Sequence, residues 1–189
     1  MASPADSASG TASAIESIDA FVAGWDGNDD GAPKVLGLVG FHADPRPSRW
    51  LLLAVDPGEG VLREHVLAGE GGGAARVVAP LPGQDLPELP LRRPSLKIDS
   101  DEALGIAASL AAEKGRAFAT AHLHLRVREE GSEPVWLVAF HTASRTPVGS
   151  VSLSAESGAI LRESWEAAAQ PLRAAGAATL TDASRAAKP

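Results

Sequence analysis

The sequence contains no cysteine among its 189 residues. This excludes disulfide bonds, thiol nucleophiles and cysteine-ligated zinc, but it leaves the cellular compartment open. Basic residues are also scarce, because 17 lysines and arginines stand against 24 aspartates and glutamates, for a net charge of −7. A chain with so little positive charge is poorly suited to phosphate backbones, so we expect no nucleic-acid binding.

The chain also lacks any apolar run near the roughly 18 residues that a membrane helix requires, so we expect no membrane insertion. No signal peptide is visible in the given chain, because residues 1–6 have neither a positive segment nor an apolar one. The small residues there would equally suit a mature N-terminus. The residues therefore leave both a cytoplasmic protein and one that has lost its signal open.

What the chain does have is 44% hydrophobic residues, enough to bury a core in one or two domains. Composition and periodicity divide it into five segments. These are a disordered tail at 1–11, a first α+β repeat at 12–80, a Pro-rich linker at 81–95, a second α+β repeat at 96–166, and a mobile Ala-rich tail at 167–189.

Each repeat is predicted to begin with a capped amphipathic helix, at residues 13–25 and about 99–114. Short apolar segments divided by Pro and Gly turns follow, which is typical of antiparallel hairpins. The expected strands are residues 34–43, 50–56, 61–68, 74–79, 118–128, 134–142, 148–154 and 159–165. We therefore predict an α+β fold of two tandem helix-plus-antiparallel-meander repeats, which one continuous sheet with both helices on one face would accommodate.

An internal match favours duplication. Sliding the sequence by 99 positions lays residues 38–42 over 137–141 and residues 62–64 over 161–163 without a gap. In both copies the match predicts core positions for Val39/Val138 and Phe41/Phe140. It also predicts that His42 and His141 face away from the core.

Residues 98–107 (IDSDEALGIA), Trp136 with its neighbours at 134–138, and residues 156–161 (ESGAIL) resemble the PepSY-like domain family. The resemblance covers residues 96–166. The first half matches only in its strands, with Gly37 where Trp136 stands, so it resembles a degenerate copy. The family implies a helix packed on an antiparallel sheet, in a non-enzymatic, peptidase-inhibitory or peptide-binding module of secreted or membrane-attached bacterial proteins.

Three histidines are predicted to gather on the face of the second sheet that turns away from its helix. A four-residue hairpin at 130–133 would place His122 opposite His141, and strand alternation puts His124 on the same face. The spacing of His122 and His124 is known in strand metal sites, but Arg126 beside them would repel a cation. We therefore predict solvated or interface histidines, with no metal ion and no cofactor.

The first sheet is expected to leave one face apolar, because its strand at 50–55 is apolar on both sides. The candidate binding residues there are Leu36, Leu38, Leu51, Leu53 and Val55. Either the other repeat or the linker covers these side chains, or they form a surface for a partner.

No catalytic arrangement is apparent, because the chain has no Gly-x-Ser-x-Gly elbow and the acidic pair at 101–102 suits a helix N-terminus. We therefore predict a non-enzymatic module that binds an unknown protein or peptide through a sheet face or edge. By the family resemblance it would be inhibitor-like and periplasmic or extracellular. The alternative is a structural or assembly protein that forms homodimers through the apolar face of the first repeat.

Overall fold

A computed structural model describes residues 12–25, 31–68, 71–79, 87, 89–128 and 133–166 of the chain. The two predicted tails, at 1–11 and 167–189, and part of the predicted linker, at 81–86 and 88, lie outside these ranges. Within them the fold is α+β, as predicted, with two helices and an eight-stranded antiparallel sheet.

The elements follow the predicted order, a helix and four strands in each half. The first half contains α1 (Ala14–Ala23), β1 (Lys34–Ala43), β2 (Trp50–Val55), β3 (Leu62–Ala68) and β4 (Gly71–Val77). The second half contains α2 (Ser100–Glu113), β5 (Thr120–Arg126), β6 (Val135–His141), β7 (Pro147–Ser154) and β8 (Ile160–Trp165), after a short 3₁₀ helix, η1 (Arg93–Ser95). Strand β4 begins inside a glycine run that was expected to be a turn, because pairing with β3 overrides the low strand preference of glycine.

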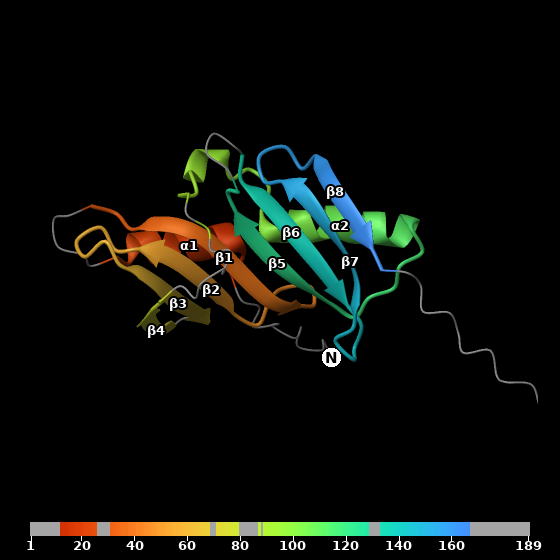
Figure 1. Cartoon of the computed structure of the whole chain (residues 1–189), viewed down its shortest axis with the longest axis horizontal. Helices are drawn as coiled ribbons and strands as arrows, with labels where there is room; N and C mark the ends of the chain where they lie inside the picture. Colours follow the sequence, from red (N-terminus) through yellow and green to blue (C-terminus); the bar gives the residue numbers. More distant parts are fainter. Residues whose placement is uncertain are drawn as a thin grey trace, which may run out of the picture.

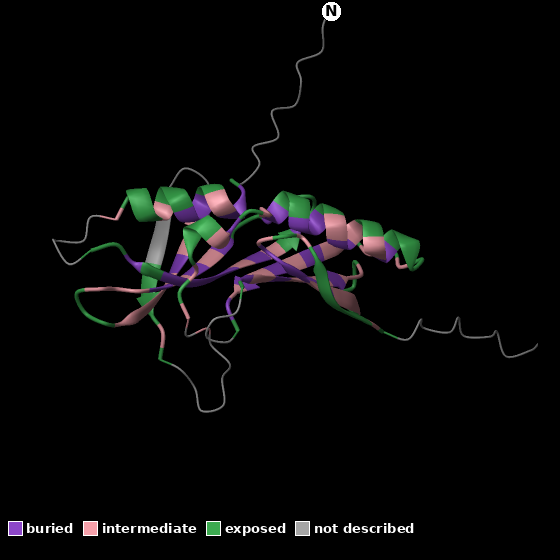
Figure 2. Cartoon of the chain, turned by 90° about the horizontal axis from the view of Figure 1, so that it is seen from above, coloured by how far each residue is buried: buried purple, intermediate pink, exposed green. Residues whose placement is uncertain are grey.

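The eight strands form one continuous sheet in the order β4-β3-β2-β1-β5-β6-β7-β8, and each neighbouring pair is antiparallel (Figure 1). The two halves join where β1 pairs with β5 at the centre. Both helices lie on the same side of the sheet (Figure 2). The sheet therefore has one face covered by helices and one face that no helix of the described chain covers, which is called the open face below.

The two helices meet at their N-termini. Ser13 caps α1 in a capping box, as its position predicts. The hydroxyl of Ser100 accepts a hydrogen bond from the Ala14 backbone N–H at 3.1 Å. The Asp99 carboxylate accepts from both Ile15 N–H, at 3.1 Å, and Ser100 N–H, at 2.6 Å. One carboxylate thus satisfies donors at the positive ends of both helices.

The core lies between the helices and the sheet and is shared by both halves. Its largest members, Trp50 and Trp136, are fully buried. The indole N–H of Trp50 donates to the Ala12 carbonyl and that of Trp136 to the Ile98 carbonyl, each at 2.9 Å. Each tryptophan therefore ties a strand to the residue that leads into a helix.

The sequence match at 99 positions does not relate corresponding elements. It lays β1 on β6 and β2 on β7, although β5 is the first strand after α2 and β6 is the second. The similarity of residues 38–42 to 137–141 therefore joins strands that hold different places in the order of elements.

Candidate functional site

The open face of the sheet brings most of the candidate residues together. Strand alternation sends half-buried side chains from five adjacent strands to this face. They are Val39 and Phe41 of β1, Leu51, Leu53 and Val55 of β2, His122 and His124 of β5, Leu137, Ala139 and His141 of β6, and Ser150 and Ser152 of β7. The surface is apolar in its first half and richer in histidine and serine in its second.

Two of the five leucine and valine candidates in the first half do not belong to the exposed part of this surface. Leu38 is fully buried in the core beneath the helices. It lies directly opposite Leu52, another core residue, and residues that face each other in a ladder share one side of the sheet. Leu36 is 5% exposed and lies at the irregularity in β1 between Val35 and Gly37.

The prediction that Val39 and Phe41 point into the core is wrong, because the ladder and a ring contact place both side chains on the open face. Val39 lies opposite Leu51, on the open face. The ring of Phe41 contacts the ring of His122, with 5.4 Å between centroids. The sequence match assigned Val39 and Phe41 to the core because they align with core residues of β6. Both sides of β1 are apolar, so its own residues did not contradict this assignment.

The three candidate histidines do lie on the open face, but in a different register from the predicted one. His141 is opposite Thr120, and His122 is opposite Ala139. The described ladder ends at the pair Arg126 and Val135, and most of the predicted turn, at 130–132, lies outside the described residues. Because the shift is an even number of residues, every side chain keeps its predicted face.

The structure adds His42 to this group and separates His124 from it. The centroid of the His122 ring is 4.9 Å from that of His42 and 4.5 Å from that of His141. His42 belongs to β1, so only the pairing of β1 with β5 brings it there. No local sequence signal indicates that pairing.

His124 instead lines a hollow of about 230 Å³ in the open face, together with Leu53 and Leu137. Pro87, from the predicted linker, also lines it and lies so close to Gly37 that a Cβ there would be 3.2 Å from the proline Cγ. Of the two alternatives for the apolar face, cover by the linker is therefore realised in part, beside Leu53.

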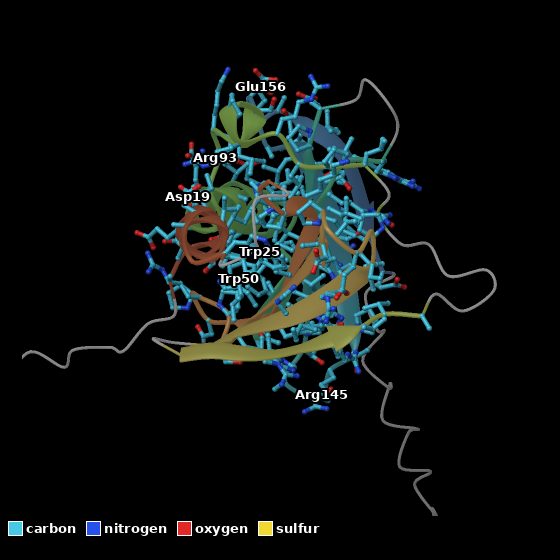
Figure 3. All side chains as sticks on the ribbon, turned by 90° about the vertical axis from the view of Figure 1, so that its left-hand side faces the viewer. Asp19, Trp25, Trp50, Arg93, Arg145 and Glu156 are labelled. Atoms are coloured by element: carbon cyan, nitrogen blue, oxygen red, sulfur yellow. The ribbon has the colours of Figure 1, made fainter. Side chains whose placement is uncertain are left out.

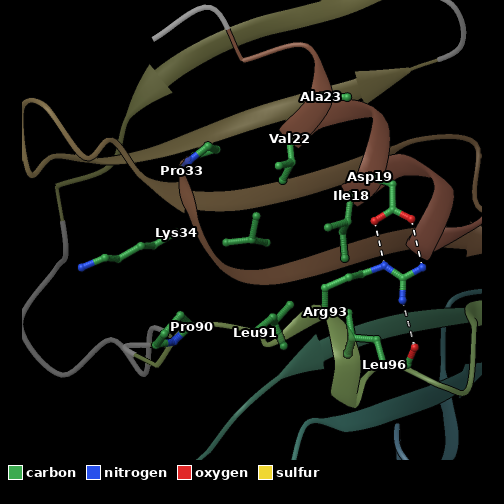
Figure 4. A pocket seen from close by; sticks show the side chains of 11 residues that line it. Ile18, Asp19, Val22, Ala23, Pro33, Lys34, Pro90, Leu91, Arg93 and Leu96 are labelled. Carbon is green, nitrogen blue, oxygen red and sulfur yellow. Dashed lines mark hydrogen bonds and ion pairs between the residues drawn. The ribbon is translucent and has the colours of Figure 1, made fainter. Parts of the chain in front are cut away.

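A second hollow, of about 410 Å³, lies on the helix side between α1, the start of β1 and the segment before α2 (Figure 4). Its lining is mostly aliphatic, with Ile18, Val22 and Leu91 among its residues. Arg93 donates two hydrogen bonds to the Asp19 carboxylate, at 2.7 and 3.0 Å, and a third to the Leu96 carbonyl. This fork fastens the end of the linker to α1.

Burial lowers the pKa of three histidines, His65, His122 and His124, because the charged ring loses hydration. Nearby positive charge adds to the effect, from Arg63 at His65 and from Arg126 at His124. His65 packs against Phe21 on the helix side, at 4.6 Å between ring centroids. The folded protein therefore binds these protons less tightly than the unfolded chain does.

We expect the protein to be most stable above about pH 6.5, where histidine is neutral in the unfolded chain too, and to lose stability as the pH falls toward the lowered pKa values. Urea midpoints measured at about pH 8 and about pH 5.5 test this. The difference should shrink in His65→Leu and in His124→Gln. Equal midpoints of the wild-type protein at the two pH values would contradict the prediction.

Within the ranges described, no group of three or more His, Asp or Glu side chains is arranged to hold a metal ion. Neither of the two described helices combines the length and apolar character needed to cross a membrane. The fold and the site thus define an α+β protein with helices on one side of an antiparallel sheet and a mixed apolar and histidine surface on the other. Searches of family models, curated proteins and solved structures find no match for this chain.

Proposed function

We propose that the protein is a non-enzymatic binding module that engages a protein or peptide through the open face of its sheet. The observation that carries the proposal is the apolar group formed by Val39, Phe41, Leu51 and Leu53, with Leu137 on the far side of His124. Large apolar side chains gathered on one exposed face are typical of interaction surfaces. The side chains come from central strands of the sheet.

The resemblance to PepSY-like domains supports an inhibitor-like role in a periplasmic or extracellular bacterial protein. Its basis in the second half is a helix with an acidic cap at Asp99, followed by a four-stranded meander that contains Trp136. The edge of β8 offers a second mode of peptide binding, by addition of a strand. Ile160 and Leu161 of that edge strand are 46% and 49% exposed.

We also propose that the two halves are a duplication, in a register of 86 positions. Ala14 and Ser100, which begin the two helices, are separated by 86 positions, and so are Trp50 and Trp136. Each tryptophan donates to a carbonyl 38 positions before it, just ahead of its helix. A shared tie between helix and strand, at one constant spacing, supports common descent of the halves more directly than the strand match at 99 positions does.

Leu53→Asp tests the binding surface, because it places a charge at the centre of the apolar group, where a partner would have to desolvate it. We expect proteins retained from the native host by the immobilised wild-type chain to be lost with this variant. Ser109→Asp adds the same charge to the exposed side of α2 and should leave retention unchanged. Equal retention by the two variants, with far-UV circular dichroism showing both folded, would refute the open face as the binding surface.

The alternative is self-association through the same apolar group. Light scattering of the wild-type chain over a range of concentrations distinguishes self-association from binding of another protein. A dimer that Leu53→Asp converts to a monomer would favour assembly as the function. A wild-type monomer at all concentrations would exclude it.

A further inference from the structure

Three histidine rings meet at one end of the sheet, where β1 and β6 end and β5 begins. His122 of β5 lies between His42 of β1 and His141 of β6, with ring centroids 4.9 and 4.5 Å away. Arg145, in the turn between β6 and β7, also acts on the charge of His122. Figure 3 shows Arg145 at the opposite end of the molecule from Glu156.

The environment of His122 is positive, although the whole chain carries a net charge of −7. The charged groups that lower its pKa, after burial itself, are His141, His42, His124 and Arg145, in that order. The side chain of Arg49 adds a further cation, 5.9 Å from the centre of the ring of Phe41, which contacts His122. The charged groups that act on this ring are therefore all basic.

The histidine rings are also incompletely satisfied. Nε2 of His122 and Nδ1 of His141 are buried and have no hydrogen-bond partner in the structure. Both rings are nevertheless partly exposed as a whole, and His42 and Arg145 are exposed. Solvent therefore reaches the cluster. A proton bound at either of the two buried nitrogens would find no hydrogen-bond acceptor there.

The backbone is strained at the same place. His42 and Arg145, at φ values of 55° and 65°, are the two non-glycine residues of the described chain that adopt a positive φ. Such conformations cost free energy and persist where the surrounding structure holds them. The turn that carries Arg145 also exposes the hydroxyls of Ser144 and Thr146, which lie 3.2 Å apart.

We propose that His42, His122, His141 and Arg145 form an oxyanion site that takes a carboxylate or phosphate group. A planar guanidinium and imidazole N–H groups are the donors that such groups prefer, and charge-assisted hydrogen bonds to them are stronger than neutral ones. A metal cation would instead be repelled by Arg145 and Arg49. The site goes beyond the proposed function, because apolar binding on the open face requires no anion.

Histidine side-chain resonances of ¹⁵N-labelled full-length protein test the proposal, with sodium phosphate titrated at about pH 6.5 against sodium chloride of matched ionic strength. We expect saturable shifts at His42, His122 and His141, and none at His65, which lies on the other face of the sheet. A hexaglutamate peptide, titrated in parallel, shows whether a carboxylate-bearing chain or free phosphate is the better ligand.

Arg145→Asn removes the guanidinium and retains a residue type that tolerates a positive φ. We expect it to weaken binding of the better probe at least about five-fold, since it removes one charge-assisted contact. Arg162→Gln removes a positive charge from β8, away from the cluster, and should leave binding unchanged. Shifts that do not saturate, or that are the same in wild type and Arg145→Asn, would overturn the proposal for both anions.

Discussion

Trp136→Ala is expected to lower the free energy of unfolding by about 3–5 kcal/mol, the range for removing a large buried aromatic side chain. Trp136 is fully buried, and its indole N–H donates to the Ile98 carbonyl at 2.9 Å. The substitution leaves a cavity beneath α2 and also leaves that carbonyl without its donor. Urea denaturation followed by far-UV circular dichroism measures the loss without relying on tryptophan fluorescence.

Two further variants separate the contributions. Trp136→Phe keeps most of the volume and should cost less, about 1–3 kcal/mol, mainly for the lost hydrogen bond. Trp165→Phe provides a matched control on edge strand β8, where the indole is half-buried and donates to the Glu163 carboxylate. If Trp165→Phe were as destabilising as Trp136→Phe, burial and the tie to the helix would not explain the effect.

Gly40→Ala is expected to destabilise the protein by about 1–3 kcal/mol through overpacking. Gly40 lies opposite Trp50 in the β1–β2 ladder, on the core side. An added Cβ would lie 2.5 Å from Pro47 Cγ and 2.5 Å from Trp50 Cζ3, closer than such atoms can approach. The tryptophan that ties β2 to α1 would therefore have to move.

Gly105→Ala is the matched control, because Gly105 lies in the middle of α2 with open space where its Cβ would be. This variant should stabilise the protein by about 0.5–1 kcal/mol, since alanine favours a helix over glycine. Thermal denaturation of the two variants should show shifts of opposite sign. A neutral or stabilising effect of Gly40→Ala would contradict the prediction, because the core around Trp50 would then accommodate the added methyl group.

Strand alternation predicted the faces of β5 and β6 correctly, because it is a local property and one side of each strand is uniformly apolar. Leu123, Leu125, Trp136, Val138 and Phe140 are all buried, and the histidines between them face the other way. The prediction for β1, taken from the sequence match, was wrong, because β1 is apolar on both sides and contains an irregularity between Val35 and Gly37. There only the ladder with β2 decides which side faces the helices.

The candidate site was predicted only in part because its assembly depends on contacts between distant segments. That Leu51, Leu53 and Val55 share one face follows from alternation within their own strand. The position of His42 beside His122 follows from the pairing of β1 with β5, which joins residues of different halves. The residue that lies opposite His141 in the β5–β6 ladder depends on the length of the turn between these strands, which the sequence did not specify.

The pairing of β1 with β5 also determines what would happen if the halves were separated. Each half alone would present a strand with a free row of backbone donors and acceptors, and such an edge promotes pairing with another chain. Because this central pair is antiparallel, a two-fold axis could relate two identical halves across it, as in an isologous dimer. If the halves descend from one ancestor, that ancestor would have been complete only as a dimer, and the fused chain makes permanent an interface that once depended on protein concentration.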